Sequence, residues 1–345
     1  MTLLFVLFVA FVVYTLHSTG YFRTIAPYMQ GEIAQQIDLV GAEDMTISKD
    51  GNFMLISSDD RAATKKGRPK QGGIYWMDLK KEPFEVKLIS GDFKQEFHPH
   101  GISLLQLDST HYKLWVINHV EDKHSIEVFS LEGDSLKYLE TLKDDKMVSP
   151  NDIVAVEEDR FYFTNDHFYK PMLGKLAEGY LGMATANVMY FNGKEFMEVA
   201  KGMAYANGIN WDKNRDLLFV ASTRDFLVKV YEVEADGNLI FVENINCNTG
   251  VDNIEIDTNG GLWIGAHPSL MAYTAYANFE ENKAPSEVLK ITYASKNKYI
   301  IEKPLLDDGL KSSGSSVAAT DGKFLFVGTV MDKHFLIIKR ENEKY

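Results

Sequence analysis

The stretch NDIVAVEEDRFYFTND, residues 151–166, combines a short alternating strand, a polar turn and a second apolar strand. The same pattern recurs in DMTISKDGNFMLISS (44–58), GISLLQLDSTHYKLWVIN (101–118), NGINWDKNRDLLFVAST (207–223), DNIEIDTNGGLWIGAH (252–267) and SVAATDGKFLFVGT (316–329). The first apolar residues of these six units are Met45, Ile102, Ile153, Ile209, Ile254 and Val317. Units 45 to 63 residues apart, each holding about four strands, are typical of propeller blades. The sequence therefore predicts an all-β, six-bladed β-propeller.

Two residues precede each aligned apolar position, and in a propeller these pairs are expected to face one another at the central channel. They are Glu43-Asp44, His100-Gly101, Asn151-Asp152, Asn207-Gly208, Asp252-Asn253 and Ser315-Ser316. Asn or Asp before a strand also serves as turn chemistry, which explains a single pair more easily than the whole set. Four carboxylates on one axis would repel unless a cation neutralised them. Because Ca²⁺ takes six to eight oxygen ligands and Mg²⁺ prefers fewer from protein, the set predicts a central calcium channel.

Two histidines are candidates for proton transfer. His100 belongs to the series of pairs, and His119 ends the next strand of the same predicted blade. Neighbouring imidazoles lower each other's tendency to be charged, so one can accept a proton from water near neutral pH. The alternative is two polar rings in the channel wall. His267 is expected near the same mouth, with a plain loop histidine as the alternative, whereas the polar-turn residues His98, His111 and His124 receive no role.

The N-terminus is apolar. Residues 3–22, LLFVLFVAFVVYTLHSTGYF, contain no Asp, Glu, Lys or Arg, and about 20 such residues can span a bilayer as a helix. We interpret residues 1–25 as an uncleaved signal anchor and residues 26–345 as one propeller domain outside the cytoplasm. A cleaved signal of a secreted protein and a buried core helix are the alternatives.

Composition narrows the function. The chain has 36 Lys and Arg against 49 Asp and Glu, a net charge of −13, which disfavours nucleic acid as a partner. Its single cysteine, Cys247, excludes an intrachain disulfide and a cysteine-based zinc site, and is interpreted as a buried inert thiol. Motifs of serine hydrolases, zincins and nucleotide-binding proteins are absent from the sequence. The basic stretch 61–70, RAATKKGRPK, is predicted to be a solvated loop, or alternatively to cover the channel mouth or contact anionic lipid.

Several motifs, taken together, carry a family resemblance. They are AED (42–44), HPHGIS (98–103), VINH (116–119), PNDIVAV (150–156), FTNDHFY (163–169), ANGI (206–209), VDNIEID (251–257), LWIGAHP (262–268) and SEVLKI (286–291). From about residue 40 to the C-terminus the chain resembles the serum paraoxonase/arylesterase family. The N-terminal apolar segment fits as well, because these enzymes retain an uncleaved signal sequence.

The resemblance implies a six-bladed propeller with two calcium ions that hydrolyses lactones, aryl esters and, promiscuously, phosphotriesters. A catalytic calcium would be bound by Glu43, Asn151, Asn207, Asp252 and Asn253. A deeper structural calcium would take Asp44, Asp152 and the backbone carbonyl of Ile102. The resemblance also implies that His100 and His119 form a dyad activating water and that His267 lies near the substrate. Asp252 is a rival base, because a carboxylate beside a metal can also orient water.

The chain departs from the family pattern in three places. The animal enzymes join their chain ends by a disulfide whose cysteines are missing here, Ala266 replaces their free cysteine, and the lid segment around residues 60–72 is dissimilar. Substrate preference therefore does not transfer. Two other functions stay open: a noncatalytic, membrane-tethered propeller acting as chaperone or binding protein, and a calcium-dependent sugar lactonase. The HPHGIS and NDIVAV motifs favour the paraoxonase group over the latter.

Overall fold

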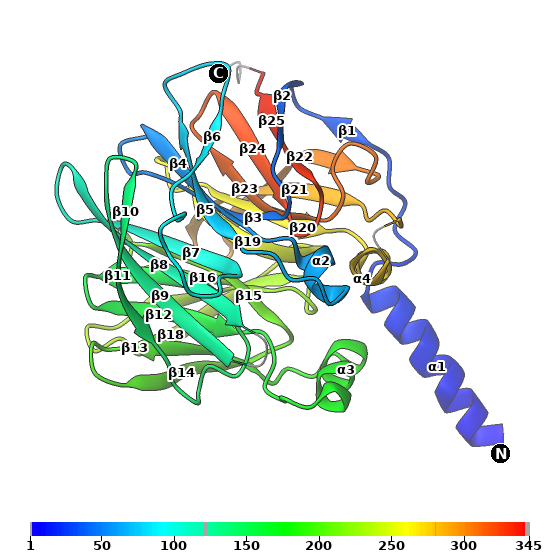
Figure 1. The fold of residues 1–345 in the computed structure, drawn as a ribbon. Helices are drawn as coiled ribbons and strands as arrows, with labels where there is room; N and C mark the ends of the chain where they lie inside the picture. The colour runs from blue at the N-terminus through cyan, green and yellow to red at the C-terminus, as the bar shows by residue number, and fades with distance from the viewer. Residues whose placement is uncertain (1, 121–122, 280, 342–345) are drawn as a thin grey trace.

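The computed structural model describes residues 2–120, 123–279 and 281–341, and its six antiparallel sheets are arranged around a central axis (Figure 1). The first three blades hold four strands each. They comprise β3 (Ala42–Ile47), β4 (Phe53–Ser58), β5 (Gly73–Asp78) and β6 (Val86–Leu88); β7 (Pro99–Gln106), β8 (His111–Val120), β9 (Lys123–Glu132) and β10 (Ser135–Leu142); and β11 (Pro150–Glu157), β12 (Arg160–Asn165), β13 (Ala186–Phe191) and β14 (Phe196–Met203).

The remaining blades include the two strands nearest the N-terminus. Blade four holds β15 (Ala206–Asp212), β16 (Leu217–Ser222), β17 (Leu227–Val233) and β18 (Leu239–Asn246). Blade five holds β19 (Gly250–Ile256), β20 (Leu262–His267), β21 (Ser286–Ser295), β22 (Lys298–Asp307) and the added β1 (Tyr28–Met29). Blade six holds β23 (Ser315–Thr320), β24 (Phe324–Thr329), β25 (His334–Lys339) and the added β2 (Glu32–Asp38). The predicted six-bladed propeller is confirmed.

The core is a ring of apolar layers between the blades. The six aligned apolar residues lie in the innermost strands and are at most 4% exposed, as follows from the values for Met45, Ile102, Ile153, Ile209, Ile254 and Val317. A buried apolar cluster lies between each pair of neighbouring blades around the ring. Each blade therefore buries both of its faces against its neighbours, which explains why strands such as Phe53–Ser58 are buried along their whole length.

Strand β2 closes the ring. It forms the outer strand of the last blade and pairs with β25 from Glu32↔Lys339 to Asp38↔His334. Main-chain hydrogen bonds and side-chain packing thus join the two ends of the propeller in a chain that lacks a cysteine pair. Cys247 is free and buried, as predicted.

The closing strand should contribute to stability through its buried face. Ile37 is buried in the cluster between blades six and one, whereas Ile33 on the same strand is 41% exposed. We expect Ile37→Ala to lower the free energy of unfolding by about 2–4 kcal/mol, because a buried isoleucine is replaced by a cavity. Ile33→Ala serves as the matched control and should cost less than about 1 kcal/mol. Urea unfolding measures both, and equal losses would contradict closure through the packed face.

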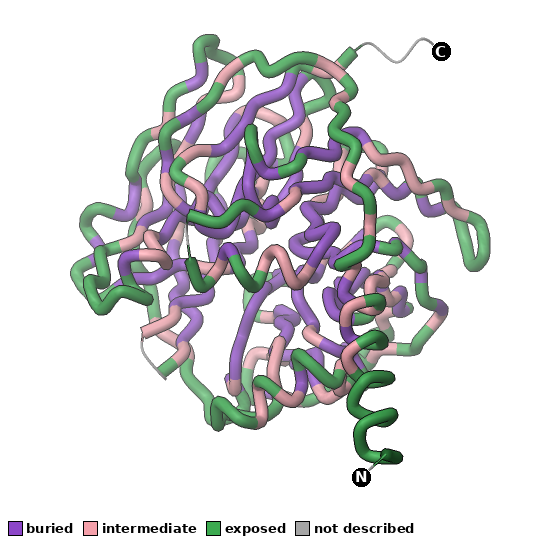
Figure 2. The backbone as a smooth tube through the Cα atoms, turned by 90° about the vertical axis from the view of Figure 1, so that its right-hand side faces the viewer, coloured by how far each residue is buried: buried purple, intermediate pink, exposed green. Residues whose placement is uncertain are grey.

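The helices lie on one side of the propeller, where α2 (Arg61–Lys65), α3 (Met172–Leu181) and α4 (Leu270–Asn278) are found near the end of α1 (Thr2–Ser18) (Figure 1). Most of α1 is exposed (Figure 2). Among the residues that the structure describes, no helix is long and apolar enough to cross a membrane. The predicted N-terminal helix is present, and it ends at Ser18.

The residues that follow α1 are packed onto the propeller. Arg23 forms an ion pair with the fully buried Glu287, with 2.7 Å between its Nη1 and Oε2. The carbonyl oxygen of Thr19 accepts a hydrogen bond of 2.9 Å from the backbone N–H of Leu270, at the start of α4. The N-terminal segment is therefore fixed at the end of the propeller that carries α4.

Candidate active site

A break in strand register brings the polar pairs to the propeller axis. In all six blades the pairing between the first two strands shifts at the pair, for example between Ala42 and Asp44 and between Pro150 and Ile153. Such an irregularity leaves residues unpaired and re-aims their side chains. The recurring sequence pattern thus corresponds to a recurring distortion, one per blade, located where the innermost strands approach one another.

Two of the six pairs contain glycine because the inner strands lie too close for a side chain. A Cβ atom on Gly101 would lie 2.5 Å from the Cα atom of Asp152. A Cβ atom on Gly208 would lie 2.4 Å from the carbonyl oxygen of Asp252. Neither clash can be relieved by turning a side chain, because the obstructing atoms belong to the backbone. These glycines therefore let neighbouring blades meet tightly around the axis.

Four buried side-chain oxygens at the axis accept no hydrogen bond from the described residues. They are Oε2 of Glu43 and the Oδ1 atoms of Asn151, Asn207 and Asn253. The amide nitrogens of the same asparagines are engaged, donating to Asp166 Oδ2 at 3.3 Å, Thr223 Oγ1 at 3.1 Å and Glu43 Oε1 at 3.0 Å, respectively. These bonds fix the orientation of the amides and leave their oxygens unpaired. Buried oxygens without partners are costly, so this arrangement needs a ligand.

The donor chemistry fits calcium. Carboxylate and amide oxygens are hard ligands of the kind that Ca²⁺ takes in sets of six to eight. Within the described ranges, no group of three or more His, Cys, Asp or Glu side chains could hold a metal by itself. A site built here therefore depends on the asparagine oxygens as much as on Glu43 and Asp252, both of which are buried.

Asp44 and Asp152 connect neighbouring blades at the axis. Oδ2 of Asp44 accepts a hydrogen bond of 2.8 Å from the backbone N–H of Ile102 in the next blade. Oδ2 of Asp152 makes the equivalent bond of 2.7 Å to Ile209. Burial and then the charge of Glu43 raise the pKa of Asp44 to about 8, and burial and then Asp44 raise the pKa of Asp152 well above its ordinary value. This pair is placed as the deeper set implied by the family resemblance.

The raised carboxyl pKa values predict how stability depends on pH when calcium is chelated. Burial also raises the pKa of Glu43 and Asp252, so the folded protein binds more protons than the unfolded chain. This contribution is complete below the ordinary pKa of 3.8 and is lost as the pH rises through about 8. We therefore expect the free energy of unfolding in EGTA to fall between about pH 5 and about pH 9.

Calcium should reverse this loss at the alkaline end, because it neutralises the ionised carboxylates. Chemical denaturation at each pH, with EGTA and with calcium, measures both trends. A free energy of unfolding in EGTA that stays flat or rises toward pH 9 would contradict the buried acidic cluster.

The structure brings His100 and His119 together. Their ring centroids are 4.9 Å apart with nearly perpendicular planes. Burial lowers the pKa of both imidazoles well below the ordinary value, aided by Arg61 at His100 and by His100 at His119. Both rings are therefore neutral near pH 7 and able to accept a proton.

A third histidine extends this pair, which the sequence interpretation missed. His124, assigned to a polar turn without a role, places its Nδ1 2.8 Å from Nδ1 of His119 across the β8–β9 hairpin. The assignment is wrong because the hairpin pairs these two residues directly. His98 and His111 contact carboxylates instead, Asp59 and Asp108, and lie outside the cluster.

Arg61 corrects a second interpretation. The stretch 61–70 was expected to be solvated, and residues 64–70 are exposed. Arg61, however, begins α2 and places its guanidinium 3.2 Å from Nδ1 of His100 and 3.8 Å from Oε2 of Glu43. It therefore covers the polar centre, as the alternative interpretation of this stretch proposed. The dissimilar lid segment gave no sequence signal for the contact.

A cavity of about 410 Å³ leads to the metal-side residues. Its lining includes Asp252, Asn207 and His267, together with apolar side chains from α3 and α4. Nε2 of His267 lies 2.8 Å from Oδ2 of Asp252, and its ring stacks on Tyr273 with centroids 3.9 Å apart. His100 and His119 are not among the lining residues. The cavity therefore approaches the cluster from the Asp252 side.

Tyr205 was not singled out in the sequence, although it lines the cavity just before Asn207. Its φ of 65° lies in the left-handed region, which is uncommon for a bulky residue and is found at functional sites. Its ring contacts His167 with centroids 5.2 Å apart. The local sequence offered no sign of this backbone conformation.

Comparison with known proteins follows this geometry. A model of the family described as Arylesterase matches residues 30–337. The chain belongs to the serum paraoxonase/arylesterase family. Serum paraoxonase/arylesterase 2 from Gallus gallus is 36% identical over 302 residues, covering 85% of this chain and 84% of that protein. Human serum paraoxonase/arylesterase 1 is 33% identical over 301 residues, with coverage of 85% and 84%.

Solved structures of other proteins share the architecture of this family member. A luciferin-regenerating enzyme has a TM-score of 0.54 at 12% identity, covering 92% of this chain and 98% of its own. The calcium-binding protein regucalcin from Agrobacterium tumefaciens has a TM-score of 0.51 at 11% identity, with coverage of 91% and 96%. Identities this low show the fold alone.

Proposed function

We propose that this family member is a calcium-dependent hydrolase of lactones and aryl esters, with phosphotriesters as promiscuous substrates. The observation that carries the proposal is the set of unpaired buried oxygens on Glu43, Asn151, Asn207 and Asn253. With Asp252 they would hold a catalytic calcium. Asp44, Asp152 and the carbonyl of Ile102 would hold a second, structural ion, which the blade-linking bonds of the two aspartates support.

Bound calcium would supply Lewis acidity toward the carbonyl or phosphoryl oxygen of the substrate. The residues of the chain do the rest. The Asn253 amide, bonded to Glu43, fixes the carboxylate on the axis. His267, bonded to Asp252, holds that carboxylate at the inner end of the cavity and contacts substrate there. Apolar side chains of α3 and α4 exclude water around the bound ester.

Proton transfer is assigned to the histidines. His100 accepts the proton of the attacking water, and His119 orients its ring and shares the resulting charge. Their depressed pKa values and the 4.9 Å separation support this assignment. Asp252 is the second candidate base, favoured by its place in the cavity lining, which the two histidines do not share.

Activity on a substrate panel tests the function itself. Purified protein should hydrolyse phenyl acetate and aliphatic lactones in calcium and lose this activity in EGTA. Hydrolysis that persists fully in EGTA would contradict calcium dependence. Failure on every ester and lactone, with calcium bound and the fold intact, would favour the noncatalytic binding protein instead.

Substitution separates the two bases. We expect His100→Gln to lower kcat for phenyl acetate by roughly 10²- to 10⁴-fold, because glutamine cannot accept the proton at neutral pH. His119→Gln should lower kcat less, since it acts through His100. His111→Gln, an exposed histidine away from the site, is the matched control and should match the parent. If both site variants retain activity within a few fold while Asp252→Asn loses it, Asp252 is the base.

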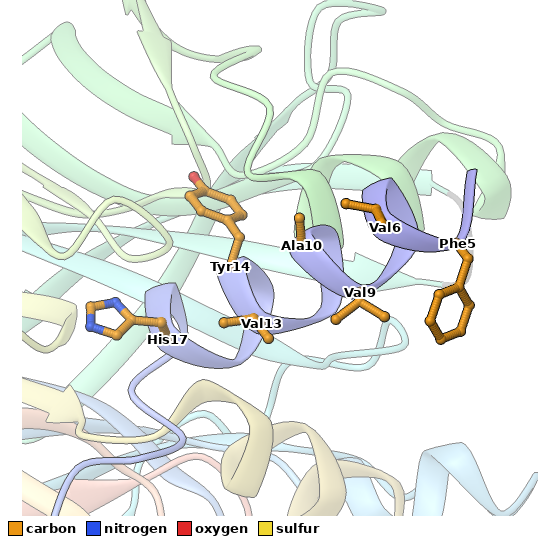
Figure 3. Close-up of a pocket in the computed structure, with 7 residues that line it drawn as sticks. All are labelled: Phe5, Val6, Val9, Ala10, Val13, Tyr14 and His17. Carbon is orange, nitrogen blue, oxygen red and sulfur yellow. The ribbon is translucent and has the colours of Figure 1, made fainter. Parts of the chain in front are cut away.

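We further propose that residues 1–25 attach the protein to a membrane, with the propeller on the extracytoplasmic side. Helix α1 carries no charged Asp, Glu, Lys or Arg. Figure 3 shows an open apolar groove along it, lined by Phe5, Val6, Val9, Ala10, Val13, Tyr14 and His17. Near its end, α3 exposes Met172 at 70% and Leu173 at 82%. Apolar surface of this extent supports lipid contact.

Vesicle binding tests the attachment. The full chain should float with phosphatidylcholine vesicles in high salt, because apolar burial does not depend on screening. Deletion of residues 1–13 should abolish flotation and leave a folded propeller, since the Thr19 and Arg23 contacts remain. Ile300→Asp removes an exposed apolar residue of blade five and should float like the parent. Flotation of the truncated chain would assign the attachment elsewhere.

A further inference from the structure

We propose that Arg61 makes the site selective for esters and lactones that carry a carboxylate or a similar anionic group. This inference rests on the proposed hydrolase function and names its substrate class. The juxtaposition behind it is a fixed guanidinium beside the histidine pair and Glu43, at the start of α2.

Neutral acceptors hold the Arg61 guanidinium in place. Nη1 donates to the carbonyl oxygen of Val330 at 3.3 Å, and Nη2 donates to that of Pro99 at 3.1 Å. Nη2 also lies 3.2 Å from Nδ1 of His100, which must accept because arginine only donates. These contacts orient the group without cancelling its charge.

The ion pair that the structure gives Arg61 is a loose one. Oε2 of Glu43 lies 3.8 Å from Nη2, beyond hydrogen-bonding distance. Glu43 is also a proposed calcium ligand, so its charge serves the metal. By contrast, Arg23 at the other end of the same side has a dedicated partner in Glu287 at 2.7 Å. Arg61 therefore presents a positive charge that an incoming anion can neutralise.

The neighbouring cavity has the same sign of charge. Its lining contains Lys175 and Arg224 but, among acidic residues, only Asp252 within the described ranges. Arg224 is engaged with Ser18 and with the carbonyl oxygen of Gly179, which leaves Lys175 on α3 as the second cation facing the cavity. A chain with a net charge of −13 thus places positive charge around its candidate site, which attracts anionic substrates.

A carboxylate matches this arrangement. The planar guanidinium can donate two parallel hydrogen bonds to one carboxylate, which a neutral ester or an alkyl chain cannot accept. Solvent reaches the position, since the side chains of Arg61 and His100 are 15% and 17% exposed. A purely structural Arg61 would affect all substrates equally, so the ratio between charged and neutral substrates separates the two roles.

The experiment compares monophenyl succinate with phenyl valerate, which share phenol as leaving group and differ in a terminal carboxylate or methyl group. We expect the parent to prefer the succinate ester in kcat/KM, and Arg61→Gln to reduce that preference about tenfold or more, chiefly through KM. Arg68→Gln removes the same charge from an exposed position of the same segment and should keep the parent's preference. An unchanged ratio in Arg61→Gln, or equal losses on both esters, would overturn the inference.

Binding to the calcium-loaded protein separates this inference from the hydrolase function. Calorimetric titration with benzoate and with its neutral isostere benzamide should show tighter binding of benzoate to the parent, and loss of that difference in Arg61→Gln. If neither ester is hydrolysed, the hydrolase function fails while the benzoate result still decides the inference. Equal affinity of the parent for benzoate and benzamide would overturn it, even if Arg61→Gln does not fold.

Discussion

Four buried oxygens on one axis are the constraint on which the rest of this structure depends. Oε2 of Glu43 and the amide oxygens of Asn151, Asn207 and Asn253 accept no hydrogen bond from the described residues. Native proteins avoid such atoms because leaving a buried acceptor unpaired costs about 1–3 kcal/mol each. The asparagine nitrogens are bonded to protein groups, so the amides cannot turn away. A bound cation relieves this cost, which links the stability of the centre to its chemistry.

The surrounding ring tolerates a polar centre because its stability comes from elsewhere. Apolar clusters fill every gap between neighbouring blades, and strand β2 joins the last blade to the first part of the chain. At the axis itself, Asp44 and Asp152 accept backbone hydrogen bonds from the next blade. The channel residues can therefore be arranged for ligand binding, while the blades hold them at fixed positions.

The sequence predicted the parts of this architecture that repeat. The alternating strands and the buried positions aligned with Met45 follow from a local pattern, and the polar pairs stand in register with it. The register break at each pair was not predicted, because a bulge depends on the partner strand as well as on the residues that form it. The role of β2 in blade six was also missed, since a closing strand lies far from its partner along the chain.

Within the site, success followed the same division. The pair of His100 and His119 could be predicted because both residues belong to one hairpin of the repeat. Arg61 reaches the site from a segment outside the repeat, and its contact to His100 depends on where α2 packs. His124 sits in the same hairpin, yet its contact with His119 needs the strand register to be known. Long-range packing therefore decides what the motif leaves open.

The calcium content of the purified protein tests the central claim most directly. The measurement is equilibrium dialysis against trace calcium followed by atomic emission, for the parent and for Asn253→Ala. The account predicts two bound ions per chain in the parent and loss of one of them in Asn253→Ala, where an unpaired oxygen has been removed. A parent chain that remains folded and retains no calcium would contradict it.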